Sequence, residues 1–290
     1  MHILISGASS SIGQYVCKRL AEDYPDATLT GLYHRHAPSF QAPNLSYIAA
    51  DFLQDTADAV PIALLKEIDI FLHLASVTPG NNPDGNSDHF FVANAHTPAM
   101  LVKTMLMSGR LRKIFHLSST AVYDRTRGLT LDETSPKSHK DPYGLSKLMF
   151  ENALYTLHAH FAFYALSLRL PVLLTPGVTN NFMSKWKKAM AAGETLSVAH
   201  PAAAFNAVCP DWALYEACTL FLTSGGTGCK IANIAASKAT SLKDILHARG
   251  YPNWKEAESA MPPQLIVTLH QGHRLYPAYE ALTEAVKFLS

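Results

Sequence analysis

An α/β fold is predicted from this sequence: a doubly wound parallel sheet with a small C-terminal lobe. Short apolar runs alternate with longer segments of helical periodicity up to about residue 170. Such alternation is typical of a parallel sheet with helices on both faces. A turn containing glycine also follows the first apolar run directly. Beyond residue 170, Pro171, Pro176 and Gly177 interrupt the alternation, so we expect the smaller lobe to begin there.

The individual elements follow from these patterns. Strands are expected at compact apolar runs, which lie at residues 2–6, 28–33, 46–49, 69–74, 113–118 and 164–170. Helices are expected where apolar residues recur at helical spacing, as Ile12, Val16 and Leu20 do. These segments are residues 12–22, 58–66, 88–108, 143–160 and 180–192. Residues 79–87, rich in Gly, Asn and Pro, predict a loop.

We expect two domains. Residues 1–170 would form the larger one, and residues 171–290 would form mainly the lobe. Residues from about 205 to 235 would return to the larger domain, because a helical pattern and a short apolar run resume there. Pro262-Pro263 and a terminal helix would complete the lobe.

The composition excludes several classes of protein. The 290 residues, 48% of them hydrophobic, are enough for one full-sized core plus a small lobe. A formal net charge of +1 gives no electrostatic case for binding nucleic acid or a membrane surface. No apolar run approaches the ~20 residues of a membrane-spanning helix. The first strand is expected to begin next to Met1, so no signal peptide is expected.

The cysteines and histidines do not form metal-binding patterns. The four cysteines show neither Cys-x-x-Cys spacing nor the pattern of a small disulfide-bonded domain. We interpret them as buried thiols in a reducing compartment, so a cytoplasmic protein is expected. The 14 histidines include close pairs, but none of these pairs has a third ligand at helical or hairpin spacing. No bound metal is therefore expected.

A glycine turn at the start of the chain predicts a dinucleotide site. Gly7-Ala-Ser-Ser-Ser-Ile-Gly13 follows the first strand, and a helix starts near Ile12. This is the context that a Rossmann dinucleotide fingerprint requires. Gly7 would permit the tight turn, Gly13 would let the helix pack close to the strand, and the amides at the helix start would receive the pyrophosphate. Ser10 stands where the pattern usually has its middle glycine. The expected cofactor contacts here are Gly7, Ser9, Ser10, Ser11, Ile12 and Gly13.

The end of the second strand favours NADP over NAD. An acidic residue usually stands about 20 residues after the glycine turn, where it binds the ribose 2′-hydroxyl of NAD. This sequence has Tyr33 or His34 at that place, followed by Arg35. Arginine suits a 2′-phosphate through its charge and its forked donors, so Tyr33 and Arg35 are expected cofactor contacts. The alternative is that Arg35 is a solvated loop cation and that the cofactor is NAD.

Two short motifs in the middle of the chain predict acid–base chemistry. Ser118-Ser119-Thr120 ends an apolar run, and Tyr143 and Lys147 would lie one turn apart on one helix face. A free tyrosine has a pKa of about 10, but a neighbouring ammonium favours the phenolate and lowers that pKa. A serine hydroxyl beside the phenol would hold a substrate oxygen. Such a set moves a proton on or off a carbinol while a cofactor takes the hydride.

With these motifs, the chain resembles the extended short-chain dehydrogenase/reductase family, in its NAD(P)-dependent nucleotide-sugar epimerase and dehydratase group. The resemblance covers nearly the whole chain. It rests on the glycine turn, His73-Leu-Ala-Ser76, Ser119-Thr-Ala-Val-Tyr123 and Pro142-Tyr143-Gly-Leu-Ser-Lys147. It implies that residues 1–170 are an NAD(P)-binding Rossmann domain and that the lobe binds the substrate.

The resemblance also implies roles for single residues. Tyr143 would be the general acid or base, and Lys147 would lower its pKa and hold the nicotinamide ribose. Ser119, favoured over Ser118 by its spacing to Tyr123, would donate to the substrate oxygen. Further cofactor contacts would be Asp51, Phe52, Leu74, Ala75, Ser76, Asn94 and Pro171, together with Tyr143 and Lys147. Substrate contacts would be Ser118, Ser119, Thr120, Thr78, Asn180 and Asn181. For Asn180 and Asn181, a role in capping the next helix is an equal alternative.

Two departures from the family pattern narrow the activity. The family's 4,6-dehydratases carry an Asp-Glu pair after the catalytic serine, whereas Thr120 and Ala121 follow Ser119 here, so dehydratase activity is not expected. Family epimerases often hold the nucleotide diphosphate with an arginine, and that position here is Ala204. The candidate substitutes are Lys185, Lys187, Lys188 and Arg274. For the three lysines, an exposed helix face is the favoured alternative.

The expected function is that of an NAD(P)-dependent oxidoreductase acting on a sugar that is nucleotide-linked by the family resemblance. It would be a 4-epimerase if the hydride returns within one turnover, or a 4-ketoreductase if reduced cofactor is consumed; the preference for NADP favours the reductase. Two alternatives stay open: a reductase of a non-sugar carbonyl compound, and a non-catalytic NADP-binding regulator of the same fold. We also expect a homodimer, because the helix from Tyr143 is apolar around more than one face. Burial of that helix within one subunit is the competing account.

Overall fold

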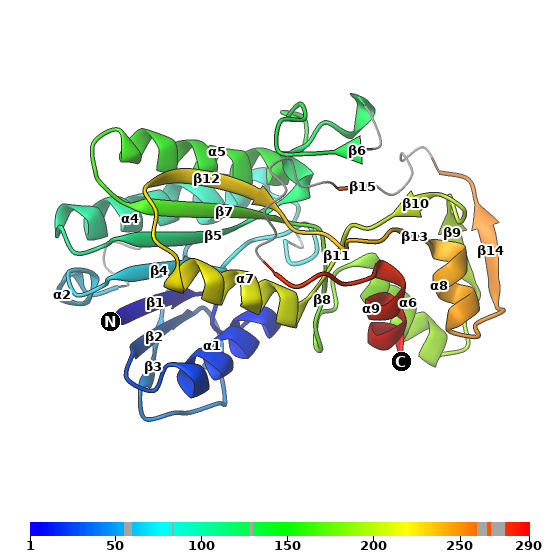
Figure 1. Ribbon diagram of the computed structural model, residues 1–290, viewed down its shortest axis with the longest axis horizontal. Helices are drawn as coiled ribbons and strands as arrows, with labels where there is room; N and C mark the ends of the chain where they lie inside the picture. Colours follow the sequence, from blue (N-terminus) through cyan, green and yellow to red (C-terminus); the bar gives the residue numbers. More distant parts are fainter. Residues whose placement is uncertain (55–59, 83, 128–129, 260–265, 268–275) are drawn as a thin grey trace. The chain divides into compact units, whose positions relative to one another are not determined.

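A seven-stranded sheet forms the centre of the larger unit in the computed structural model of the chain (Figure 1). The structure describes residues 1–54, 60–82, 84–127, 130–259, 266–267 and 276–290. Across the sheet, the strands are β12 (Gly228–Asn233), β7 (Tyr164–Leu170), β5 (Lys113–Ser119), β4 (Ile70–His73), β1 (His2–Ser6), β2 (Thr28–Tyr33) and β3 (Leu45–Ala49). β1 pairs in parallel with β2 and β4, β2 with β3, and β4 with β5. The predicted doubly wound sheet is thereby confirmed.

The six predicted strands all occur in this sheet, with ends that differ by at most one residue. Every residue of β4 is buried, and so are all residues of β1 after His2. Strands buried on both faces have no solvent side for polar residues, which explains their nearly continuous apolar sequences. The seventh strand, β12, comes from the segment that was expected to return to the larger domain.

The helices of this unit also follow the prediction, with two differences. They are α1 (Ser11–Asp23), α2 (Ile62–Leu65), α3 (Ser87–Phe91), α4 (Thr97–Met107) and α5 (Pro142–His158). The helix predicted at residues 58–66 is confirmed only over the single turn of α2, and its first residues lie outside the described ranges. Within those ranges, no helix is long and apolar enough to cross a membrane.

The second difference is a π-helical turn, Val92–His96, inside the helix predicted at residues 88–108. There the Thr97 amide donates to the carbonyl of Val92, five residues back. Pro98 explains the irregularity, because it has no amide hydrogen and its ring would collide with the carbonyl of Asn94, four residues earlier. Turns of this kind are frequent at functional sites, and Asn94 is one of the predicted cofactor contacts.

The strand order reverses between β1 and β4. From β1 the chain moves outward to β2 through α1, and from β4 it moves the other way to β5 through α4. Because such crossovers are right-handed, α1 and α4 cover opposite faces of the sheet. Figure 1 shows α1 on the lower side of the sheet and α4 and α5 on the upper side. Ligands of sheets of this kind bind beyond the carboxyl ends of the strands at the reversal.

A core cluster between the sheet and its upper helices holds α5 in place. Leu4, Phe71 and Ile114 from the strands belong to one buried cluster with Val102 of α4 and Phe150 of α5. Burying each of these side chains contributes about 1.5–3 kcal/mol. Helix α5 is therefore fixed against β5 by packing as well as by the polar contacts described below.

The second compact unit contains Tyr123–Ser138, Arg169–Leu220 and Ala232–Ser290. Its elements are β6 (Thr130–Leu131), β8 (Val172–Leu174), α6 (Phe182–Ala191), β9 (Leu196–Ala199), β10 (Ala204–Phe205), β11 (Val208–Pro210), most of α7 (Asp211–Thr223), β13 (Thr240–Ser241), α8 (Leu242–Ala248), β14 (Trp254–Ala257), β15 (Ile266–Val267) and α9 (Ala281–Leu289). Its strands pair two by two: β8 with β11, β9 with β14, β10 with β13 and β6 with β15.

This division is more interleaved than the predicted one. The change at Arg169 falls within two residues of the break predicted after residue 170. Tyr123–Ser138 groups with the second unit, although it precedes that break, and of the 205–235 segment only Phe221–Ile231 groups with the first unit. The short segments that follow the strands at the carboxyl edge of the sheet do not differ in composition from their neighbours. The sequence alone therefore does not show which of the two units each segment belongs to.

Candidate active site

The glycine turn lies directly after β1, at the reversal of strand order. Gly7 has a φ of +75°, and a Cβ there would lie 2.8 Å from the Cα of Ala75, which follows β4. A Cβ on Gly13 would lie 2.0 Å from the carbonyl oxygen of Gly7. Both positions therefore exclude larger residues, as the dinucleotide pattern requires.

Ser10, which replaces the usual middle glycine, begins α1. Its hydroxyl accepts a hydrogen bond from the Gly13 amide at 3.1 Å and donates to the Gly7 carbonyl at 2.8 Å. A serine at this position satisfies one free amide of the helix and stabilises it. The other amides of the first turn have no partner within the helix, so they can receive an anion such as a pyrophosphate. Around them, Ser9 and Ser11 are half-buried, Ser10 is exposed and Ile12 is buried.

The adenine end of the predicted cofactor site lies at the ends of β2 and β3. Tyr33 is half-buried, and Arg35 is exposed in the loop that follows. The Asp51 carboxylate lies 3.3 Å from Nε2 of His34, and its other oxygen accepts from the Leu53 amide at 3.0 Å. His34 after β2 and Asp51 after β3, which were singled out by separate sequence arguments, are thus in contact. Phe52 stacks on His73, with ring centres 6.0 Å apart.

The nicotinamide end is built on the segment after β4. Leu74 is buried, and Ala75 and Ser76 are half-buried. The Ser76 hydroxyl donates to Oδ1 of Asn94 at 3.2 Å. Asn94 is fully buried and donates through Nδ2 to the hydroxyl of Ser146 in α5 at 3.1 Å. The π-helical turn therefore connects the segment after β4 to α5.

The predicted catalytic residues come together at the carboxyl end of β5. Ser119 ends that strand, and Tyr143 lies in the first turn of α5. Asp141 begins the helix by accepting from the amides of Tyr143 and Gly144, at 3.1 and 3.2 Å. The side chains of Ser119 and Ser76 lie near enough to the Tyr143 hydroxyl to lower its pKa. Ser76, predicted only as a cofactor contact, thus lies at the catalytic tyrosine.

The predicted lowering of the Tyr143 pKa is wrong for this arrangement. Burial of the phenol raises its pKa and outweighs the effect of the nearby Ser119 and Ser76 side chains, which lower it. The nearby carboxylate of Asp141 raises the pKa further. The phenol is accordingly protonated at neutral pH and is ready to act as an acid.

Lys147 lies one turn after Tyr143 and is buried, with 1% of its surface exposed. Its ammonium donates to the carbonyl oxygen of Leu117 in β5 at 3.0 Å. Burial lowers the pKa of Lys147 to about 7, against the attraction of the Glu151 carboxylate, which raises it. Lys147 is therefore a partly charged group at neutral pH, held at the strand that ends in Ser119.

Ser118 does not face the catalytic hydroxyls. It is 2% exposed, and its hydroxyl donates to Oε1 of Glu151 at 2.6 Å. We correct its predicted role as a substrate contact for this reason.

Thr120 is also buried, in the short 3-10 turn after β5. Thr78 is half-buried in the loop after β4, where its amide and hydroxyl both donate to Oδ1 of Asn81.

A model of the NAD dependent epimerase/dehydratase family matches residues 3–203, more than half of the chain. The chain belongs to this family. Over 188 residues, or 61% of the chain, it is 30% identical to the trifunctional UDP-glucose 4,6-dehydratase/UDP-4-keto-6-deoxy-D-glucose 3,5-epimerase/UDP-4-keto-L-rhamnose-reductase RHM2 of Arabidopsis thaliana. It is 27% identical to the dTDP-D-glucose 4,6-dehydratase of Mus musculus over 51% of the chain. The matches span only 27% and 44% of these two relatives.

Solved structures of the epimerase/dehydratase fold resemble the whole chain. The UDP-glucuronic acid 4-epimerase from Bacillus cereus in complex with NAD has a TM-score of 0.81 and 18% identity, over 99% of this chain and 96% of that one. The UDP-N-acetylglucosamine 4-epimerase from Methanobrevibacter ruminantium M1 has a TM-score of 0.79 and 18% identity, over 99% and 97%. At these identities the likeness concerns the fold.

In the second unit of this epimerase/dehydratase family member, Asn181 is a helix cap. Its side chain accepts from the Ser184 amide at 2.9 Å, and the Ser184 hydroxyl and the backbone of Asn181 complete a capping box. Its Nδ2 donates to the Leu173 carbonyl at 2.7 Å. The capping alternative is thus confirmed for Asn181. Asn180 is exposed beside it, and Pro171 is half-buried between β7 and β8.

The candidate substitutes for a diphosphate-binding arginine have different surroundings. Lys187 donates to the carbonyl of Phe288 at 2.7 Å, near the end of α9, where a cation stabilises the helix terminus. Lys185 and Lys188 are exposed on α6. Arg274 lies outside the described residues. Lys187 therefore has a structural partner. Lys185 and Lys188 lie on an exposed helix face, which was the alternative interpretation for these lysines.

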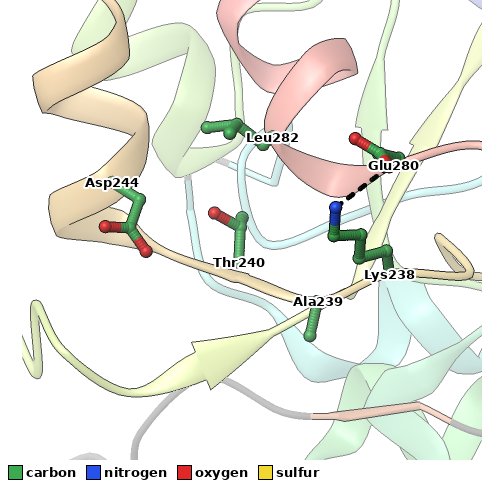
Figure 2. Close-up of a pocket in the computed structure, with 6 residues that line it drawn as sticks. All are labelled: Lys238, Ala239, Thr240, Asp244, Glu280 and Leu282. Carbon is green, nitrogen blue, oxygen red and sulfur yellow. Dashed lines mark hydrogen bonds and ion pairs between the residues drawn. The ribbon is translucent and has the colours of Figure 1, made fainter.

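A hollow of about 200 Å³ lies in the second unit (Figure 2). Lys238 and Glu280 form an ion pair at 3.2 Å on one side of it. Asp244 lies on another side, where it accepts from the Ser241 hydroxyl at 2.7 Å at the start of α8. Lys238 and Glu280 are paired with each other, and Asp244 is bonded to Ser241 at the start of α8. We therefore assign no ligand to this hollow.

Sequence reasoning missed several residues of the site. Glu151 follows Lys147 by four positions, a spacing that indicates contact on a helix, but a single glutamate is usually solvated. Gly144 was noted only as part of the tyrosine motif. Another network, in the second unit, joins the buried side chains of Arg169, Tyr123 and Asn233. Arg169 donates to the Tyr123 hydroxyl at 2.9 Å, and that hydroxyl donates to Asn233 at 2.6 Å.

Proposed function

We propose that this protein is an NAD(P)-dependent oxidoreductase that acts on a nucleotide-linked sugar, as a 4-ketoreductase or a 4-epimerase. One observation carries the proposal. The Tyr143 hydroxyl lies near the Ser119 side chain, and Lys147 lies one turn away on the same buried helix face. These groups stand at the carboxyl edge of the sheet, next to the glycine turn, where a dinucleotide would bind.

The cofactor residues fit a dinucleotide. Gly7 and Gly13 have no room for a Cβ, and the start of α1 offers amides to the pyrophosphate. When bound, the nicotinamide supplies the hydride chemistry. Ser119 would orient the substrate oxygen and donate to it. Tyr143 would pass its proton to that oxygen during ketone reduction, or receive a proton in the reverse direction. Lys147 would hold the ribose hydroxyls of the cofactor.

A protonated Tyr143 can serve as the acid of a ketone reduction. A phenol that keeps its proton at neutral pH is the form needed to protonate a developing alkoxide. Ketoreduction uses this form directly, whereas an epimerase must also remove a proton in its first half-reaction. A tyrosine with its ordinary pKa of about 10 is protonated at neutral pH as well, so this does not choose between the two activities. We place the ketoreductase first and the epimerase second because the proposed preference for NADP favours a reaction that consumes reduced cofactor.

We propose NADP as the preferred cofactor. The loop after Tyr33 offers His34 and Arg35 in place of the acid that accepts the ribose hydroxyls of NAD. Arg35 is exposed and free to reach a 2′-phosphate. The His34–Asp51 pair shows that the carboxylate of this region is engaged with a neighbouring side chain.

Dehydratase activity is not part of the proposal, although the named relatives include dehydratases. Elimination needs an acid and a base beside the serine, and Thr120 and Ala121 supply neither. A reductase of a non-sugar carbonyl compound is the second candidate, because Ala204 stands where a diphosphate-binding arginine is expected. A regulator without catalysis is less favoured, since Ser119, Tyr143 and Lys147 are all in place.

The substitution Tyr143→Phe tests the proposed function. It removes only the hydroxyl, so binding of NADPH should persist while turnover of a keto-sugar nucleotide falls about 10²–10⁴-fold. Tyr155→Phe, an exposed tyrosine on the same helix, is the matched control. A panel of keto-sugar nucleotides and simple ketones, followed by cofactor absorbance, separates the two candidates. Unchanged turnover in Tyr143→Phe would refute the catalytic role.

We further propose a cytoplasmic homodimer. Four large apolar side chains are exposed on the paired helices α4 and α5: Met100, Met107, Met149 and Tyr155. A second copy of the chain would cover such a surface. The buried free thiols of Cys17, Cys209 and Cys218 suit a reducing compartment. A monomer mass by light scattering at micromolar concentration would contradict the dimer.

A further inference from the structure

Glu151 is a buried carboxyl group that no part of the proposed reaction uses. It is 1% exposed and lies one helical turn after Lys147 on α5. Its Oε1 accepts from the hydroxyl of Ser118 at 2.6 Å. A buried carboxyl group is costly unless it is hydrogen-bonded and faces a cation, so its position at Lys147 requires an explanation.

The same helix face carries three contacts with the end of β5. Gly144 approaches Ala121, Lys147 donates to the Leu117 carbonyl, and Glu151 accepts from Ser118. The first two bring Tyr143 and Lys147 to the site. The third adds a charge close to Lys147, since the carboxylate attracts the ammonium. An apolar residue would pack there at lower cost.

We propose that Glu151 is a positioning residue that favours the charged form of Lys147 in the cofactor site, and that Ser118 holds the Glu151 carboxylate toward it. This role rests on the proposed function only in assigning Lys147 to the cofactor ribose. Without the Glu151 carboxylate, burial would lower the pKa of Lys147 further, so a smaller fraction of this side chain would be charged at neutral pH. An uncharged amine would be a weaker donor to the ribose hydroxyls.

The other titratable groups around Lys147 do not supply this charge. Tyr143, on the same helix, keeps its proton at neutral pH because burial raises its pKa. His73, at the end of β4, is kept neutral because burial and the charge of Lys147 lower its pKa well below the usual value. His116 of β5 packs edge-on against Phe150 and bonds with Ser167. On the helices packed against α5, His89 pairs with Asp84 and His96 is exposed.

The decisive experiment follows the protonation of Lys147 directly. In protein labelled with ¹³C-lysine, the Lys147 signal is identified by its absence in Lys147→Met and is titrated from pH 5.5 to 9.5. Glu151→Gln keeps the shape and the acceptor for Ser118 but removes the charge. We expect the midpoint to fall by about one pH unit in Glu151→Gln. Ser118→Ala should lower it by less, because the charge remains but is held less firmly.

Cofactor binding provides the second readout. The dissociation constant of NADPH, measured by its fluorescence, should be about tenfold weaker for Glu151→Gln than for the parent at pH 8, and equal at pH 5.5. In the Lys147→Met background, Glu151→Gln should have no further effect. Glu67→Gln, an exposed glutamate of the same unit, is the matched control.

The outcomes separate this inference from the proposed function. An unchanged midpoint in Glu151→Gln would overturn the role of Glu151, whatever the protein catalyses. A lowered midpoint together with no binding of NADPH or NADH by the parent would refute the proposed function and leave the pairing of Glu151 and Lys147 established. If Glu151→Gln does not fold, an unchanged midpoint in Ser118→Ala overturns the role of Ser118.

Discussion

Gly144 lies so close to Ala121 that a Cβ on the glycine would be 2.2 Å from the alanine's carbonyl oxygen. This approach brings the first turn of α5 onto the segment just after Ser119. It explains why the Tyr143 hydroxyl lies near Ser119 although 24 positions separate the two residues in the sequence. The geometry of the proposed catalytic pair thus depends on a residue without a side chain.

Gly144→Ala should therefore separate the two hydroxyls. The neighbouring atom is a backbone carbonyl that cannot move aside, so overpacking should cost about 1–3 kcal/mol of unfolding free energy. Displacing Tyr143 by about 1 Å should lower turnover by about 10²-fold. Turnover and the midpoint of thermal unfolding check this. Gly225→Ala, at an exposed glycine with open space around it, should change neither. Full activity in Gly144→Ala would contradict the structural role.

Arg35 should control the choice of cofactor. Arg35→Ala removes the guanidinium that would bind the 2′-phosphate of NADPH. Binding of NADPH should therefore weaken about 10–100-fold, while binding of NADH should stay within about twofold. Lys66→Ala, a surface cation of the same unit, is the control. Cofactor fluorescence titrations measure both constants. Equal NADPH binding by Arg35→Ala and the parent would show that Arg35 is a solvated loop cation.

The sequence was most informative where one local rule determines the structure. The buried strands, the glycine turn at Gly7 and the helix starting near Ile12 follow from apolar runs and from the steric freedom of glycine. The seven-stranded sheet and the meeting of Ser119 with Tyr143 then follow from the topology of a doubly wound fold.

The sequence was least informative where the outcome depends on burial by distant segments. The pKa of Tyr143 is raised because the surrounding structure desolvates the phenol. The sequence motif around Tyr143 does not indicate how deeply the phenol is buried. Ser118 and Ser119 are adjacent in the sequence, yet only the packing of α5 shows that Ser118 bonds with Glu151. The turn at Asn94 had a visible signal, Pro98, which the uniform helical periodicity of residues 88–108 concealed.

Asn181→Ala should act on stability rather than on the substrate. The side chain accepts from the Ser184 amide and donates to the Leu173 carbonyl. Losing this cap should cost about 1 kcal/mol of unfolding free energy. Asn181→Asp should restore most of the loss, because it keeps the acceptor. Thermal unfolding and the KM for the substrate together check the prediction. A raised KM with unchanged stability would return Asn181 to the substrate contacts.

Lys147 should make the stability of the cofactor-free protein depend on pH. Its pKa is about 7 in the folded chain, lowered by burial, and that of an unfolded lysine is about 10.4. Between these values the unfolded chain binds more protons, so the contribution of this group to stability increases as pH rises. Below pH 7 the buried charge is fully present and destabilises the fold.

Lys147→Met removes that charge at every pH. The variant should therefore be more stable than the parent at pH 6, and this difference in unfolding free energy should shrink by about 2–3 kcal/mol between pH 6 and pH 9. Urea unfolding at the two pH values measures it. Lys66→Met, at an exposed lysine, should show no such change with pH. If the difference in unfolding free energy between Lys147→Met and the parent were the same at pH 6 and pH 9, Lys147 would titrate alike in the folded and unfolded chains. That result would contradict a buried ammonium at this site.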